Sequence, residues 1–145
     1  MSEVSKERRS GTQDMVDKLL SERQEVLVEF CKLAGLQAAS VDDRDHDLQA
    51  FCQLLVDYSA FAHFEIYERI IDGRERRGQV VEVAREVYPR IAEATETAVE
   101  FNDKYDANDH DLDLHRLDAD LSKLGEELAI RIEMEDRIIQ ALTAK

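Results

Sequence analysis

The chain has 145 residues, of which 36% are charged, and its net charge is −14 at neutral pH. This length is enough for one domain with a core of its own, and five Gly, one Pro and no Trp favour long helices over a fold of strands and turns. The negative charge repels phosphates, so it argues against direct nucleic-acid binding and favours a basic partner, although it would also keep a protein without such a partner in solution.

The apolar residues are too dispersed for a membrane protein. No run of 18 residues is free of charged and polar side chains, so no membrane-spanning segment is expected. The two cysteines, Cys31 and Cys52, stand among apolar residues, and no signal peptide precedes them. We therefore expect reduced core thiols in a cytoplasmic protein.

The first eleven residues, MSEVSKERRSG, are polar, and we expect a flexible N-terminus. The remainder, residues 12–145, is expected to form a single helical-bundle domain. Its apolar residues first recur at three-, four- and seven-residue steps between Thr12 and about Ala34. This spacing predicts a first helix that ends at Gly35.

A second helical pattern runs from about His46 to Asp72. It follows a connection in which Ser40 and Asp43 have the spacing of a helix-start signal. The sequence GRERRG, residues 73–78, places two glycines around three arginines and predicts a turn after this helix.

The C-terminal half predicts two more helices, from about Gln79 to Tyr105 and from about Leu112 to Leu142. Pro89 interrupts the third pattern, and because proline lacks an N–H and clashes with the preceding turn, we expect a kink or a split near it. Four helices with short connections predict an all-α fold, an antiparallel four-helix bundle with long helices.

The fourth helix has the clearest apolar stripe. At about 100° per residue its members fall close to one line: Leu117, Leu121, Leu124, Leu128, Ile132, Ile139 and Leu142. Glu135 lies near the centre of the same stripe. Either it is near the end of the bundle, where water or an arginine reaches it, or it is a buried carboxylate that needs a partner.

The second helix has two stripes instead of one. The expected core stripe contains Phe51, Leu55, Tyr58, Ala62, Ile66 and Arg69. Asp57, Phe64, Glu68 and Ile71 lie about 180° away from it. A helix that packs on one side only should be polar there. The second stripe is therefore either an interaction surface, which includes self-association, or a contact with another helix of the bundle.

The sequence gives little support for a metal centre. Ferritin-like iron sites need Glu-x-x-His on inward-facing helices, and that spacing is absent. Haemerythrin-like sites need about five histidines, and the chain has His46, His63, His110 and His115. Only His63 lies well inside a predicted helix. We expect no metal and no cofactor.

The segment from Asp109 to Asp113 has aspartates at the spacing of a calcium loop. It has Leu114 where an EF-hand needs glycine and Asp120 where it needs glutamate, so a solvated helix start is the simpler interpretation. Nucleophile patterns, phosphate-binding glycine loops and zinc motifs are also missing, which argues against an enzyme.

One stretch, FCQLLVDYSAFAHFEIYERI at residues 51–70, resembles the signature of the Rsd/AlgQ family, the regulators of sigma D. The matching residues are Phe51, Cys52, Gln53, Leu55, Val56, Asp57, Tyr58, His63, Phe64, Tyr67 and Glu68. The stretches YPRIAEATETAVEFND and LGEELAIRIEMEDRII are similar to the third and last helices of that family. The resemblance extends from about Met15 to Leu142.

The resemblance implies a cytoplasmic anti-sigma factor. Members of this family bind the primary sigma factor of RNA polymerase, chiefly its C-terminal promoter-recognition region, and favour alternative sigma factors as growth slows. Some are linked to alginate regulation. The sigma-contacting positions of the family include the residues that are Asp57 and Phe64 here. Both belong to the second stripe, two helical turns apart.

We therefore expect the sigma-binding residues to be Asp57, Phe61, Phe64, Glu68 and Ile71, with Phe64 as an apolar anchor. The family commonly has Ser and Gly before its His-Phe pair, and Phe61 in that span of this chain enlarges the apolar surface. Two alternatives remain open at this point. One is a metal-binding, haemerythrin-like bundle, and the other is an adaptor bundle with a different protein client.

Overall fold

A computed structural model describes residues 3–35, 41–73, 75, 77–105 and 116–144, with side chains described from residue 11 and, after the first gap, from residue 47. The described chain is all-helical and contains no strand. Its elements are α1 (Glu3–Gly35), α2 (Val41–Phe61), the π-helical segment η1 (Ala62–Tyr67), α3 (Glu68–Ile71), α4 (Gly78–Tyr105) and α5 (Leu117–Thr143). Because α2, η1 and α3 follow one another without a break, they form one long helix.

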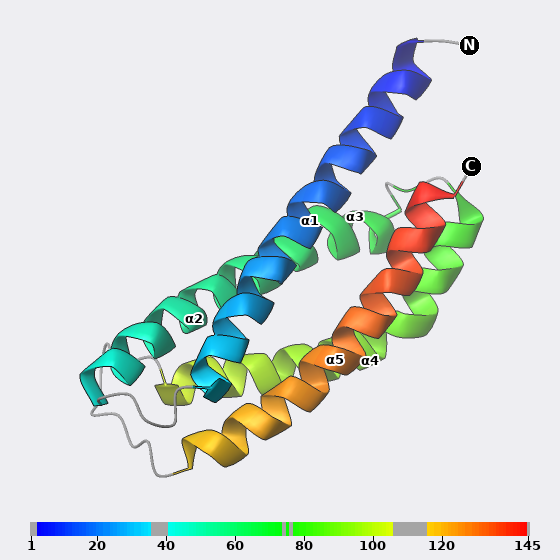
Figure 1. Cartoon of the computed structure of the whole chain (residues 1–145). Coiled ribbons are helices and arrows are strands. Elements are labelled where there is room, and N and C mark those ends of the chain that lie inside the picture. Colours follow the sequence, from blue (N-terminus) through cyan, green and yellow to red (C-terminus); the bar gives the residue numbers. More distant parts are fainter. Residues whose placement is uncertain (1–2, 36–40, 74, 76, 106–115, 145) are drawn as a thin grey trace.

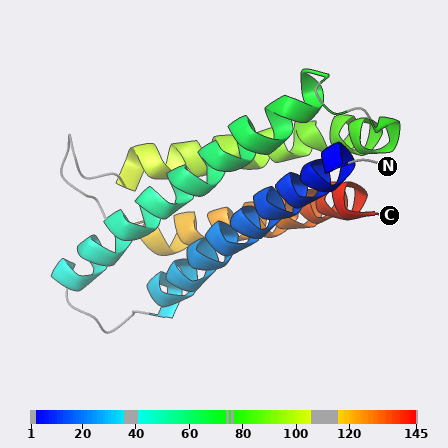
Figure 2. The same ribbon diagram turned by 90° about the horizontal axis from the view of Figure 1, so that it is seen from above.

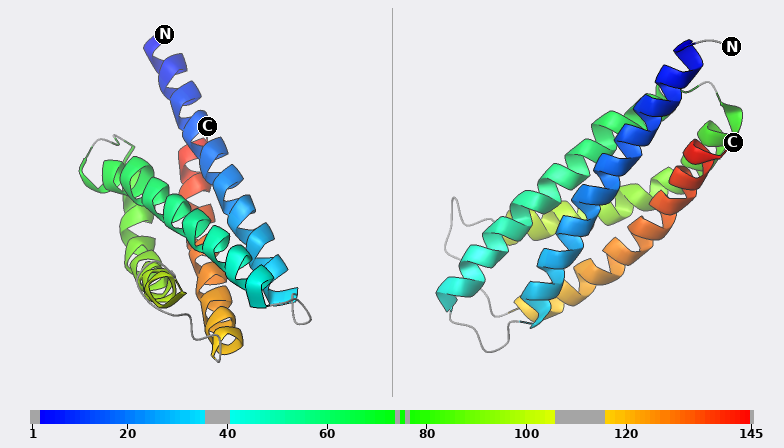
Figure 3. Two further views of the ribbon diagram at one scale, coloured as in Figure 1. Left: turned by 90° about the vertical axis from the view of Figure 1, so that its left-hand side faces the viewer. Right: turned by 45° about the horizontal axis from the view of Figure 1, so that its top comes forward.

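The long helices lie side by side and enclose one core (Figure 1). The most extensive contacts join α4 with α5 and α1 with α2, and contacts of α2 with α4 and of α1 with α5 complete the bundle. The start of α1 and the end of α5 lie at the same end of the molecule (Figure 2). The first turns of α1 extend beyond the other helices (Figure 3).

The first two helices begin earlier than the apolar pattern predicts, whereas the predicted start of the fourth, near Leu112, lies outside the described residues. α1 begins at Glu3 instead of Thr12, and α2 begins at Val41 instead of His46. Apolar spacing could not reveal these first turns because they are mainly polar, although Glu, Lys and Arg favour helix. For the third helix the predicted and observed bounds agree to within one residue. α4 passes through Pro89 as a single helix, so the predicted split is wrong.

The segment η1 changes which residues of the second helix face the core. The amide of Glu68 donates to the carbonyl of His63, five residues earlier, so this turn contains one residue more than an α-helical turn. Residues beyond η1 are rotated accordingly. The prediction that Arg69 belongs to the core stripe is wrong: Arg69 is exposed, and Tyr67 and Ile70 are buried in its place.

The apolar stripe of α5 also differs in part from the prediction. Leu117, Leu121, Leu124, Leu128 and Leu142 are buried as expected, whereas Ile132 and Ile139 are only half-buried. The fully buried side chains in the last three turns include Arg131, Glu135 and Ile138. A charged pair, Arg131 and Glu135, is thus buried beside the apolar side chains of the core.

Two local features relate sequence to packing. A Cβ at Gly125 would lie 2.8 Å from the ring of Phe30, so glycine allows α5 to approach α1 closely here. Neither cysteine is part of a disulfide. Cys52 is buried as expected, but the prediction of a core position is wrong for Cys31, which lies on the outside of α1.

Candidate functional site

Four of the five predicted binding residues are exposed on the long second helix. Asp57 of α2 is on the surface and accepts a hydrogen bond from the Gln53 amide at 3.0 Å. Phe64 of η1 is 60% exposed, the largest exposure among the large apolar side chains of the described chain. Glu68 is exposed, and Ile71 is 40% exposed. These four residues form an acidic and apolar surface, which we call the η1 surface.

Phe61 differs from the other four because it is half-buried and packs against the core. The ammonium group of Lys18, on α1, lies 4.5 Å from the centre of its ring, a cation–π contact. The carboxyl group of Glu22 is also close to this region. Its Oε2 is the buried side-chain oxygen that has no hydrogen-bond partner among the described residues. Burial raises the pKa of Glu22, Lys18 lowers it, and the nearby charge of Asp57 raises it further.

A buried polar network lies directly behind the η1 surface. Glu135 of α5 is fully buried, and its two carboxylate oxygens accept hydrogen bonds from the hydroxyls of Tyr58 and Tyr67, each at 2.5 Å. Arg131 Nε donates to Glu135 Oε2 at 3.3 Å, and Arg23 Nη1 lies 3.4 Å from Oε1. The open question about Glu135 is thereby answered: it is a buried carboxylate with partners from α1, α2, η1 and α5.

The second charge in this network is Arg131, which is 1% exposed. Its Nη1 donates to Thr95 of α4 at 3.0 Å and to Ser59 of α2 at 3.4 Å. Its guanidinium also lies 4.9 Å from the centre of the Tyr58 ring. Buried charges are stable only when they are paired and hydrogen-bonded, and the partners of Arg131 meet both conditions.

The network holds its tyrosines neutral and its arginine charged. Burial raises the pKa of Tyr58 and of Tyr67 well above the ordinary value, and the negative charge of Glu135 raises both further. Burial opposes the charge of Arg131, but the neighbouring Tyr58, Tyr67 and Glu135 outweigh it and raise the arginine pKa. Both tyrosine hydroxyls are therefore donors to the carboxylate at neutral pH.

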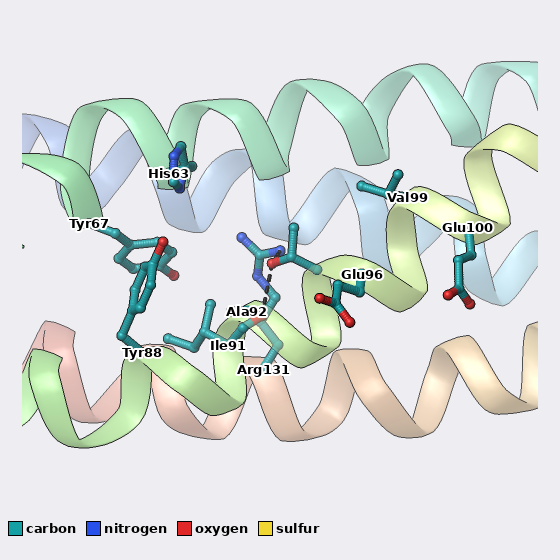
Figure 4. Close-up of a pocket in the computed structure, with 10 residues that line it drawn as sticks. His63, Tyr67, Tyr88, Ile91, Ala92, Glu96, Val99, Glu100 and Arg131 are labelled. Carbon is teal, nitrogen blue, oxygen red and sulfur yellow. Dashed lines mark hydrogen bonds between the residues drawn. The ribbon is translucent and has the colours of Figure 1, made fainter.

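A groove opens between η1 and α4, and Tyr67 and Arg131 of the buried network form part of its lining (Figure 4). Its volume is about 410 Å³. Figure 4 shows the aromatic rings of Tyr67 and Tyr88 at one end and Glu96, Val99 and Glu100 of α4 toward the other. The remaining lining residues are His63, Ile91, Ala92, Thr95 and Arg131.

The sequence analysis did not predict this groove. Its residues come from η1, α4 and α5, and no motif links them. The available signal was on α4, where Val99 stands between Glu96 and Glu100. These two acids are four residues apart and so share a helix face.

Metal binding and membrane insertion can be assessed for the described residues only. No three His, Cys, Asp or Glu side chains there are grouped so that they could hold a metal ion. His63, whose side chain is described, contacts the ring of Phe64 instead, with 4.9 Å between ring centres. Asp109 to Asp113, at calcium-loop spacing, lie outside the described residues. No helix of the described part combines the length and apolar character needed to cross a membrane.

The fold and site define a helical bundle with an exposed acidic and aromatic surface over a buried polar core, a class of protein suited to binding another macromolecule. The chain belongs to the family described as regulators of the RNA polymerase sigma(70) subunit, Rsd/AlgQ, which it matches over residues 1–143. It is thus a member of a family of transcription regulators, which confirms the resemblance seen in the sequence.

Relatives with assigned names agree with this membership. A "Regulator of sigma D" of Yersinia enterocolitica is 32% identical over 139 residues, which cover 92% of this chain and 83% of the relative. A "Regulator of sigma D" of Salmonella arizonae is 35% identical over 138 residues, covering 92% of this chain and 84% of the relative. No solved structure is significantly similar to the chain.

Proposed function

We propose that this protein is an anti-sigma factor. It binds the primary sigma factor of RNA polymerase in the cytoplasm, mainly through the C-terminal promoter-recognition region of sigma, and shifts transcription toward alternative sigma factors in stationary phase. Membership of a family of sigma(70) regulators supports the choice of partner. In this proposal the binding domain is an antiparallel bundle whose α4 is kinked at Pro89.

One observation carries the proposal: Phe64 leaves 60% of a large aromatic side chain in water, with acids nearby. Aromatic residues that anchor interfaces are typically surrounded by polar groups, and an exposed apolar patch with a polar border is typical of a binding surface. Phe64 would fill an apolar pocket of sigma. Asp57 and Glu68 would pair with its basic side chains, and Ile71 would extend the apolar contact.

The chemistry of the partner is consistent with this arrangement. A promoter-recognition module of the helix-turn-helix type carries basic side chains that contact DNA phosphates. A chain with a net charge of −14 attracts such a surface over long range. Binding at the η1 surface would then compete with DNA for the same arginines and lysines.

The test is isothermal titration of purified primary sigma factor into this protein at two salt concentrations. Asp57→Ala and Phe64→Ala should each weaken binding by about 1 to 3 kcal/mol, which is about 5- to 150-fold in Kd. High salt should weaken binding of the wild type and reduce the effect of Asp57→Ala, because exposed charges are screened.

Matched controls are available on α1. Asp17→Ala removes an exposed aspartate that, like Asp57, accepts a hydrogen bond from a glutamine four residues earlier. Val28→Ala truncates an apolar side chain that is 43% exposed. Both controls should bind as the wild type does. Undiminished binding by Asp57→Ala and Phe64→Ala would exclude the η1 surface, and absence of any sigma binding would exclude the function.

A further inference from the structure

The groove between η1 and α4 is continuous with the η1 surface. His63 lines the groove and contacts the ring of Phe64, with 4.9 Å between ring centres and an angle of 80° between the rings. A partner seated on Phe64 would therefore lie next to a residue that lines the groove. On its far side, Val99 of α4 is 52% exposed, which makes it another large apolar side chain left in water on this face.

The lining of the groove is largely apolar between its ends. Ile91 and Ala92 lie along one wall, and Tyr67 and Tyr88 close one end with their rings 6.4 Å apart, edge to face. The volume of about 410 Å³ is in the range of sites that bury the side chains of a ligand. A helix laid along α4 would bury Val99 and place apolar side chains in the groove.

The charges indicate which kind of helix would bind. The arginine in the lining, Arg131, is neutralised by Glu135 at 3.3 Å, so it does not offset the acids at the surface. Glu96 and Glu100 are exposed and lie one turn apart beside Val99. An anionic ligand, or a second copy of this acidic chain, would be repelled. A helix with an apolar stripe bordered by Lys or Arg complements both features.

We propose that the surface which binds the sigma factor does not end at η1 but crosses the groove to α4. Val99 is a second apolar anchor, and Glu96 and Glu100 bind basic side chains of the same partner, a basic amphipathic helix adjoining the part seated on Phe64. This proposal rests on the proposed function and extends it, because it assigns to α4 a role that the η1 surface alone does not require.

The experiment measures the affinity of purified primary sigma factor for variants of the full chain by isothermal titration. Val99→Ala should weaken binding about 3- to 30-fold. The double reversal Glu96→Lys/Glu100→Lys should weaken it at least about 10-fold at low salt and less at high salt. All three residues lie at the surface, so circular dichroism and Tm should stay close to the wild type.

The controls repeat each change away from the groove. Val28→Ala truncates an exposed valine of α1, and Glu126→Lys/Glu133→Lys reverses two exposed acids of α5. Weaker binding by the groove variants with unchanged binding by these controls supports the proposal. Equal loss in both charge reversals would overturn it, since only the total charge of the chain would then matter.

The outcomes separate this inference from the function on which it rests. If Phe64→Ala weakens sigma binding and the groove variants do not, the groove is not part of the interface, although the anti-sigma function stands. If sigma binds and no variant changes its affinity, neither the η1 surface nor the groove is the interface, and this inference is overturned. If sigma does not bind at all, the proposed function itself fails. A second copy of this chain is the other possible occupant of the groove, and sedimentation velocity tests for it. A dimer that Val99→Ala dissociates would assign the groove to self-association and overturn the proposal.

Discussion

Replacing Glu135 by glutamine tests whether the buried network depends on a paired charge. The substitution preserves the size of the side chain, but it leaves Arg131, which is 1% exposed, without a counter-ion. Arg23 is affected less because its Nη1 also donates to Asp136 at 2.8 Å. In addition, the NH2 group of the new glutamine replaces one carboxylate oxygen and cannot accept a hydrogen bond. The hydroxyl of Tyr58 or of Tyr67, which now donates to that oxygen, therefore loses its acceptor.

The expected loss follows from these contacts. Removing one partner of a buried ion pair lowers the free energy of unfolding by about 3 to 5 kcal/mol. This range also covers the smaller cost of the tyrosine hydroxyl that loses its acceptor. With an unfolding entropy of about 2.1 cal/mol/K per residue, a chain of 145 residues should lose about 10 to 16 °C in Tm. Urea unfolding followed by circular dichroism measures the free energy, and scanning calorimetry measures Tm.

Two further variants make the test specific. Glu133→Gln changes an exposed acid two residues away on the same helix and should shift the free energy of unfolding by less than about 0.5 kcal/mol. Adding Arg131→Met to Glu135→Gln removes the unpaired charge, so the double variant should be at least about 1 kcal/mol more stable than the sum of the single losses predicts. A loss below about 1 kcal/mol for Glu135→Gln, or strict additivity, would refute the reasoning.

Three other predictions concern titration and the π turn. Burial raises the pKa of Tyr58 and Tyr67, so their contribution to the free energy of unfolding is complete below the ordinary tyrosine pKa of about 10 and is lost as pH rises through the folded-state pKa. Tyr58→Phe and Tyr67→Phe should therefore each reduce the loss of stability at alkaline pH, measured by urea unfolding at a series of pH values. The pKa of Glu22 is also raised, so ionisation of this carboxyl group lowers the free energy of unfolding at pH 7. Glu22→Gln should therefore be more stable than the wild type at pH 7, and equal stability would contradict the burial of the carboxylate. Deleting exposed Glu65 from η1 should turn the π segment into α-helix at a cost below about 1 kcal/mol, whereas deleting exposed Gln53 from α2 should cost several times more, because it rotates buried side chains out of the core.

The sequence predicted those features that a regular helical repeat determines. α4 was located to within a residue because its apolar spacing continues on both sides of Pro89 and the turn GRERRG precedes it. Glu135 stood out because a carboxylate in an apolar stripe is unusual. Its partners could not be predicted, since Arg23, Tyr58 and Tyr67 come from other helices, and which of them meet Glu135 depends on how the helices pack.

The error at Arg69 has one physical cause. The wheel calculation assumes about 100° per residue throughout, and it assigns Arg69 to the core only if no turn differs. The composition of η1, AHFEIY, does not distinguish a turn closed at the fifth residue from one closed at the fourth. The signal that remained was the run of four-residue steps from Tyr58 through Ala62 and Ile66 to Ile70, which an α-helix would spread over about 120° and a wider turn keeps on one face.

The inserted residue also explains how one turn serves both the buried network and the exposed surface. In an α-helix Phe64 and Tyr67 would be about 60° apart and would share a face, so both rings would be in water or both in the core. A π turn advances less than about 100° per residue, which separates the two side chains further. Tyr67 can then donate to Glu135 while Phe64 remains 60% exposed. The position of the proposed anchor therefore depends on the π turn, and the bond from Tyr67 to a fully buried carboxylate holds that turn in place.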